Sequence, residues 1–210
     1  MMRVMLVVSL MLLPLRAWAA GGPPGKPSTQ PAGELRPLTA AQAEERVAEA
    51  RDLLTDTLWL GTEQYWHNGR WDDCIRICRQ IIEVDPHFVE AYTSAAWLLW
   101  SREDDAEAIE LYHACIQENP DSSEVYQDFG VYYFARHKYD EAAGMFRKAA
   151  ERGASHMEQH MLPNALERAG RPEEALKEWQ SLLKRFPDDP VAKRKIARLE
   201  EQLRAGRRHG

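Results

Sequence analysis

The sequence has 210 residues, of which 44% are hydrophobic and 29% are charged, a composition typical of globular proteins. The formal net charge is −6 at pH 7, so the basic balance expected of a general nucleic-acid-binding protein is excluded. The length is sufficient for one ordinary domain or for a short array of repeats.

Residues 1–20 have the parts of a signal peptide. Arg3 supplies a positive charge, a short apolar run follows, and small residues precede the expected cleavage near Ala19 or Ala20. We therefore expect an exported protein, either periplasmic or secreted. The apolar run is shorter than the roughly 20 residues of a membrane-spanning helix, so an uncleaved anchor is the less favoured alternative.

The segments that follow are a linker and a helix. Residues 21–38 are rich in Gly and Pro and carry few side chains to bury, so we expect a disordered linker. Thr39 and Gln42 form a capping-box pattern at the start of a helix predicted over 39–54. No helix breaker separates it from Leu58, which predicts that the helix continues into the next segment.

An apolar pattern then recurs three times at a spacing of 34 residues, and each copy contains two helical patterns separated by a turn. Pro86 and Pro120 close the first two copies. The equivalent positions hold Leu58, Gly61, Tyr65, Cys74, Cys78 and Ile81, then Tyr92, Ala95, Leu99, Ala108, Tyr112 and Cys115, then Tyr126, Phe129, Tyr133, Ala142, Phe146 and Ala149. A repeat of this length predicts stacked helix pairs that form an α-solenoid.

A fourth, degenerate copy covers residues 156–189. Pro163 stands where the first helix of the other copies carries a small residue, and it crowds the carbonyl group of Gln159. We therefore expect a bent or short first helix in this copy. Residues 190–204 predict an amphipathic helix that caps the stack, and residues 205–210 are expected to be a disordered tail.

The copies at 55–88, 89–122, 123–155 and 156–189 resemble tetratricopeptide repeats in length and in the order of their small and large apolar positions. The resemblance implies an all-α solenoid of about four helix pairs with flanking helices at both ends. It also implies that the first helices line a concave face that binds another protein or a peptide segment. No Gly-rich phosphate loop or CxxC motif is present, so we expect a non-enzymatic adaptor or scaffold without a cofactor.

The family geometry also identifies the side chains of the concave face. The first three copies have no Lys or Arg there, so a clamp for a terminal carboxylate is not expected. The predicted partner-binding residues are Trp59, Glu63, Trp66, Trp97, Trp100, Gln127, Val131 and Phe134. Because Trp anchors many interfaces and can hold a cation, we expect rows of aromatic rings that bind an apolar or basic-and-apolar segment. The alternative is that the upstream helix or neighbouring helices cover these rings.

Two other functions remain open on the sequence alone. His156 and His160 are four residues apart, as are Met157 and Met161, and such side chains suit copper in an exported metal-handling protein. Two histidines at this spacing are common without a metal, so no metal ligand is predicted. The other alternative is a structural module that assembles through its convex face.

The three cysteines, Cys74, Cys78 and Cys115, are an odd number, so at least one thiol is unpaired. Cys74 and Cys78 are four residues apart on a predicted helix, where Cβ atoms lie about 5–6 Å apart and a disulfide is disfavoured. We expect all three to be small apolar core residues.

Overall fold

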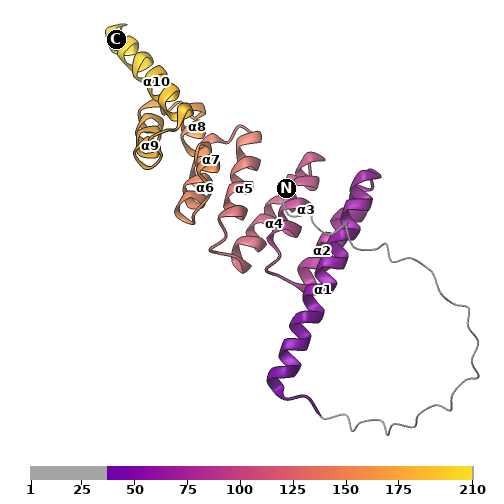
Figure 1. Cartoon of the computed structure of the whole chain (residues 1–210). Coiled ribbons are helices and arrows are strands. Elements are labelled where there is room, and N and C mark those ends of the chain that lie inside the picture. Colours follow the sequence, from indigo (N-terminus) through magenta and orange to yellow (C-terminus); the bar gives the residue numbers. More distant parts are fainter. Residues whose placement is uncertain (1–36, 210) are drawn as a thin grey trace, which may run out of the picture. The chain divides into compact units, whose positions relative to one another are not determined.

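The computed structural model describes residues 37–209, so the predicted signal peptide and most of the linker lie outside the described residues. Ala40–Gly210 forms one compact unit, and its described part is helical without strands (Figure 1). The helices are α1 Ala40–His67, α2 Trp71–Val84, α3 Val89–Ser101, α4 Asp105–Glu118, α5 Ser123–Ala135, α6 Tyr139–Glu151, α7 His156–Gln159, α8 Met161–Arg168, α9 Pro172–Arg185 and α10 Pro190–His209.

Helices joined by short turns pack in pairs, α1 with α2, α3 with α4, α5 with α6 and α8 with α9, and α10 packs on α9 (Figure 1). Each pair contacts the next pair along the chain. The predicted all-α solenoid of four helix pairs with flanking helices is therefore confirmed.

The recurring apolar positions form the core because they lie where neighbouring helices meet. Ile81, Ala108 and Phe129 are fully buried, and the rings of Tyr112 and Phe129 stack between repeats with centroids 4.6 Å apart. The three cysteines are buried and unpaired, as expected. Burial raises the pKa of Cys78 and Cys115 to about 12, so these thiols remain protonated and behave as apolar core groups.

Each turn between the two helices of a repeat contains a residue with left-handed backbone geometry. These residues are Gly69, Glu103, His137 and Gly170, with φ of 68°, 68°, 59° and 75°. This geometry lets the amide that follows reach back into the last helical turn, as the Asp104 amide does to the Leu99 carbonyl at 3.0 Å. Glycine adopts it without strain, whereas Glu103 and His137 do not.

Ion pairs tie each turn to the preceding repeat. The pairs are Arg102–Asp72, Arg136–Asp105 and Arg171–Asp140. The Arg136 guanidinium donates to both carboxylate oxygens of Asp105 at 2.7–3.0 Å and to the carbonyl of Trp100 at 2.6 Å. Acidic residues that the sequence places at helix starts thus also connect successive repeats.

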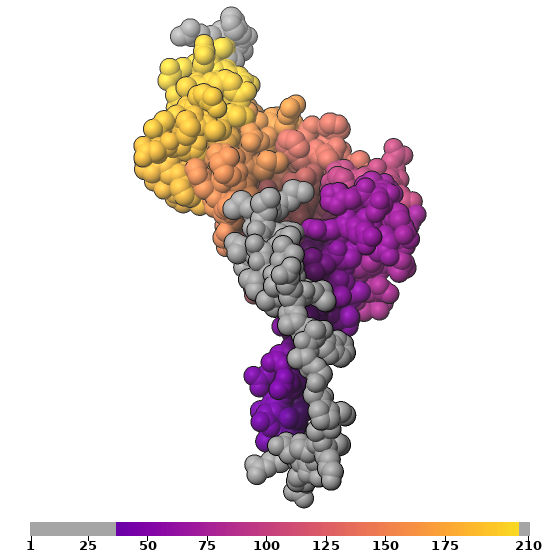
Figure 2. Space-filling view, turned by 45° about the vertical axis from the view of Figure 1, so that its right-hand side comes forward, coloured from indigo at the N-terminus to yellow at the C-terminus, as the bar shows by residue number. Residues whose placement is uncertain are grey.

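The N-terminal helix continues without a break into the first repeat as α1, as the sequence predicts. Within its first half, residues 40–54, every side chain is exposed except the half-buried Ala48. Val47 and Leu53 are both 69% exposed. Figures 1 and 2 show this half of α1, in indigo, extending beyond the packed helices.

The first helix of the fourth repeat is interrupted, as Pro163 predicts. α7 ends at Gln159 and α8 begins at Met161, with His160 between them. Pro163 is fully buried and has no amide hydrogen to donate to the Gln159 carbonyl, which removes one helical hydrogen bond.

The last helix is longer than expected. α10 is helical as far as His209, where the sequence analysis placed a disordered tail from residue 205. Among the described residues, no helix combines the length and the apolar character needed to cross a membrane.

Candidate partner-binding face

Three helices carry the predicted site residues on matched sides. Positions i, i+3 or i+4, and i+7 of a helix lie on one side. The resulting surface, called here the first-helix face, is formed by Trp59, Glu63 and Trp66 of α1, Glu90, Thr93 and Trp97 of α3, and Glu124, Gln127 and Val131 of α5. Because α3 packs against α5 and Trp66 contacts Trp97, these sides form neighbouring strips.

Four indole rings gather at one end of this face. The tryptophan cluster consists of Trp66, Trp71, Trp97 and Trp100, in which Trp66 contacts Trp71 and Trp97 at centroid distances of 5.2 and 5.4 Å. Trp97 also contacts Trp100 at 6.1 Å. Trp66 and Trp71 are each 38% exposed and Trp97 is 44% exposed, so these three rings keep large apolar areas in contact with water.

Trp100 connects the tryptophan cluster to the core, because it contacts both Trp97 and Tyr132. It is half-buried and packs edge-on against Tyr132, while the Arg136 guanidinium lies over its ring at 5.4 Å from the centroid. Since Arg136 also pairs with Asp105, Trp100 is held in place by the contact between two repeats. Of the predicted partner-binding residues in the cluster, Trp66 and Trp97 are therefore the exposed ones.

Trp71 was missed by the sequence analysis. It is the first residue of α2 and so does not occupy any of the first-helix positions that the family geometry assigns to the concave face. The turn that contains Gly69 brings it back against Trp66. The sequence feature that could have indicated this contact is an aromatic residue directly after the turn.

The other two predicted rings have aromatic neighbours outside the tryptophan cluster. Trp59 packs against Phe88 with centroids 5.3 Å apart. Phe134 contacts Tyr139 edge-on at 5.2 Å. The aromatic residues are therefore divided among three places.

Among the described residues, Trp66 and Trp97 remain exposed, whereas Trp59 and Trp100 are half-buried against neighbouring helices. The first half of α1, which was the candidate cover, is itself exposed and leaves Trp66 and Trp97 exposed.

Carboxylates gather at the other end of the same face. This acidic edge consists of Glu90 of α3, Glu124 and Asp128 of α5 and Glu158 of α7. Burial raises the pKa of Glu124 to about 7, with further contributions from the three neighbouring carboxylates. Burial also raises the pKa of Asp128 to about 6, and Glu158 acts in the same direction. Like charges are thus held close together, which favours a cationic partner.

Gln127 lies on α5 between the acidic edge and Val131. Its side chain is 8% exposed, and its Oε1 atom has no hydrogen-bond partner among the described residues.

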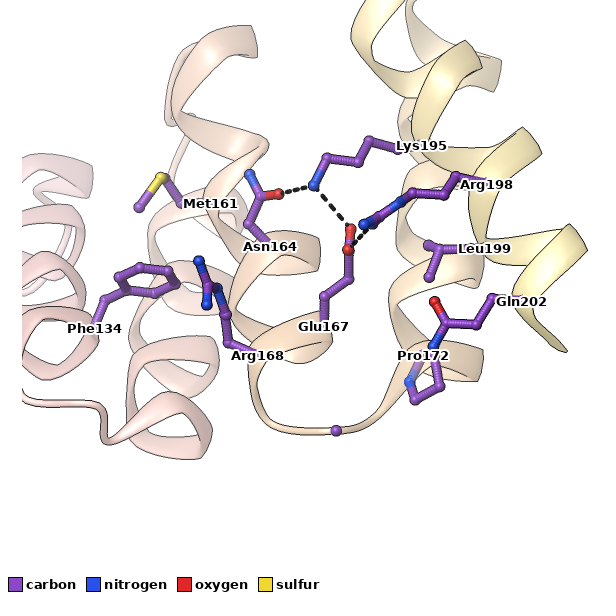
Figure 3. A pocket seen from close by; sticks show the side chains of 11 residues that line it. Phe134, Met161, Asn164, Glu167, Arg168, Pro172, Lys195, Arg198, Leu199 and Gln202 are labelled. Atoms are coloured by element: carbon purple, nitrogen blue, oxygen red, sulfur yellow. Dashed lines mark hydrogen bonds and ion pairs between the residues drawn. The ribbon is translucent and has the colours of Figure 1, made fainter. Parts of the chain in front are cut away.

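A cleft of about 680 Å³ lies farther along the chain, between α8 and α10 (Figure 3). Phe134 and Met161 line one end of it. Glu167 accepts hydrogen bonds from Lys195 at 3.2 Å and from Arg198. These charged groups pair with one another across the cleft. The ion pairs therefore connect α10 to the fourth repeat.

The structure also brings the predicted histidines together. The ring centroids of His156 and His160 are 5.0 Å apart, and both rings contact Asp189 at the start of α10. Met157 is 68% exposed, and Met161 lines the cleft of Figure 3. Asp189 was not predicted from the sequence as a neighbour of these histidines.

The architecture of stacked helix pairs defines a class of repeat protein, and comparisons with known proteins identify its family. Two tetratricopeptide repeat models match the chain, at residues 64–123 and 158–199. The chain is a tetratricopeptide repeat protein.

Solved structures share this fold. PilF of Pseudomonas aeruginosa is 18% identical with a TM-score of 0.58, and the match covers 74% of this chain and 72% of that one. A MamA protein is 18% identical with a TM-score of 0.56, covering 70% and 81%. The structure of MamA MSR-1 is 23% identical with a TM-score of 0.52, and the match covers 72% of this chain and 87% of that one. At these identities the likeness shows the fold alone. No curated protein matches the sequence.

Proposed function

We propose that this protein is an adaptor that holds a basic-and-apolar segment of a partner protein on its first-helix face. The tetratricopeptide repeats give it the architecture of a protein-interaction module. The observation that carries the finer proposal is the pair of contacting rings, Trp66 and Trp97, which are 38% and 44% exposed. Exposed clustered tryptophans are favoured anchors at protein interfaces.

The two ends of the face set the chemistry of the bound segment. Apolar side chains of the partner pack on the tryptophan cluster, and a Lys or Arg side chain meets the acidic edge. Glu90 and Trp97 are two helical turns apart on α3, a separation of about 10 Å, which an extended peptide spans in about three residues. The preferred segment therefore places a basic residue about three positions from an aromatic or aliphatic one.

Peptide titration tests this proposal. Two synthetic peptides are compared, one with Arg three positions before Trp and one in which Glu replaces that Arg. The full chain is titrated and binding is followed by fluorescence anisotropy of a dye on the peptide. The basic peptide is expected to bind at least about tenfold more tightly, because Glu would face the acidic edge.

Variants locate the site. Trp97→Ala is expected to weaken binding of the basic peptide by at least about tenfold, since it removes a hot-spot ring. Leu60→Ala is the matched control, because Leu60 is 63% exposed on α1 and lies outside the first-helix face. Equal binding of the two peptides, or unchanged binding by Trp97→Ala, would count against the proposal.

We also propose that the protein acts after export, on the strength of the signal-peptide pattern at residues 1–20. N-terminal sequencing of the protein from its native source is expected to begin at Ala20 or Gly21. A mature protein that retains Met1 would overturn this proposal.

A further inference from the structure

Three side chains converge where the fourth repeat meets the last helix. Asp189 lies directly before α10, and its Oδ2 atom is 2.8 Å from Nε2 of His156 and 2.6 Å from Nε2 of His160. The ligand-type atoms of the three residues all lie within 4.8 Å of one another. His156 and His160 belong to the interrupted first helix of the repeat, so the cluster joins elements that are about 30 residues apart in sequence.

Each member of the cluster is oriented by a neighbour. The other carboxylate oxygen of Asp189, Oδ1, accepts hydrogen bonds from the amides of Val191 and Ala192 at 2.8 and 3.0 Å. This leaves Oδ2 directed at the two imidazoles. Outer contacts of this kind fix the orientation of metal ligands in proteins.

The imidazole rings are fixed by aromatic packing. His160 lies against Trp179 with centroids 5.1 Å apart. His156 stacks on Phe186 at 3.9 Å with an interplanar angle of 26°. The two rings are therefore held beside one carboxylate oxygen.

The cluster is buried except on the side of His156. The side chains of Asp189 and His160 are 1% and 8% exposed, whereas that of His156 is 33% exposed. A buried carboxylate oxygen thus faces two imidazole nitrogens, and His156 forms the open side.

We propose that His156 Nε2, His160 Nε2 and Asp189 Oδ2 bind one divalent transition-metal ion of the zinc type. Two imidazole nitrogens and one carboxylate oxygen suit zinc, which is commonly held by three protein ligands with water in the fourth position. The exposed side of His156 provides that position and the path of entry.

Modest movement converts the hydrogen-bonded cluster into a tetrahedral site. Metal–ligand bonds of about 2.0–2.1 Å place ligand atoms about 3.3 Å apart. The His156–Asp189 distance of 2.8 Å must therefore open by about 0.5 Å, which the partly exposed His156 ring can provide, and the His160–Asp189 distance of 2.6 Å must open by about 0.7 Å through a shift of buried side chains. The bound ion would then link α7 to α10 and stabilise the C-terminal end of the stack.

Zinc titration of the full chain tests the proposal. The metal-free protein, carrying no histidine tag, is titrated with zinc chloride in a calorimeter, and its thermal unfolding is measured with and without zinc. We expect binding that saturates at one ion per chain and a higher unfolding temperature with zinc.

Two variants and a control assign the ligands. Asp189→Asn keeps an oxygen that can cap α10 but removes the charged ligand, and His156→Gln removes a partly exposed ring. Each is expected to lose at least about tenfold in zinc affinity. His67→Gln, which changes an exposed histidine at the end of α1, is expected to bind zinc like the wild type.

Two results would overturn the site. One is no saturable binding with a Kd below about 100 µM. The other is saturable binding that both Asp189→Asn and His156→Gln leave unchanged while each variant unfolds cooperatively, which would place the ion elsewhere.

Discussion

A single hydrogen atom at Gly130 permits the close approach of α5 and α6. A Cβ atom built on Gly130 would lie 2.5 Å from Cε1 of Phe146, which is 1% exposed. The small-residue requirement read from the 34-residue pattern thus has a direct steric cause in this repeat.

We therefore expect Gly130→Ala to lower the free energy of unfolding by about 1–3 kcal/mol, because it overpacks a buried contact. Gly144→Ala is the control on α6, since its Cβ would meet nothing within 4 Å, and it should raise stability by about 0.5–1 kcal/mol. Urea denaturation measures both. Equal effects of the two substitutions would contradict the steric explanation.

The turns offer a second test at the scale of one residue. Glu103 and Gly69 occupy equivalent turn positions with the same φ of 68°. Glu103→Gly is expected to stabilise the protein by about 0.5–1 kcal/mol, because it relieves left-handed strain in a side-chain-bearing residue. Gly69→Ala should cost a similar amount. Thermal unfolding that moves in the same direction for both would refute this account.

At the scale of elements, the acidic edge brings together carboxylates from α3, α5 and α7. Their proximity makes the free energy of unfolding depend on pH. The raised pKa of Glu124, about 7, means that the folded state binds this proton more tightly than the unfolded chain does. The associated destabilisation is absent at low pH and grows as pH rises from about 4.5 to 7.

Glu124→Gln removes this titration. We expect the variant to unfold at a higher temperature than the wild type at about pH 8, and the difference to shrink toward about pH 4.5. A scan of unfolding temperature against pH measures the effect. A variant that is less stable than the wild type at pH 8 would show that the carboxylate is paired with a cation.

Whether a structural feature could be predicted from the sequence depends on how far apart in sequence the contacting residues are. The break beside Pro163 and the burial of Ile81 and Phe129 follow from local backbone chemistry and from the period, so they could be predicted. The contacts of Trp71 and Asp189 depend on how a turn and a link return the chain to another helix. No spacing along one helix encodes those contacts.

At the scale of the whole molecule, the stacking of repeats places strips of side chains from separate helices side by side. Together they form the first-helix face, with the tryptophan cluster at one end and the acidic edge at the other. The contact of Trp66 with Trp97 connects α1 to α3, and the mutual effects of Glu90 and Glu124 connect α3 to α5. The sequence predicted which residues share one side of each first helix. It could not predict that Trp59 and Phe134 would instead pack against Phe88 and Tyr139.

The most direct test of the central claim is to map where a bound segment lies. The basic peptide described above is made with a benzophenone group beside its Trp, irradiated with the full chain, and the crosslinked residues are identified by mass spectrometry. We expect crosslinks in the C-terminal half of α1 and in α3 and α5, around Trp66, Trp97 and Val131. Crosslinks concentrated instead on α2, α4 and α6 would contradict the account and favour binding through the opposite face.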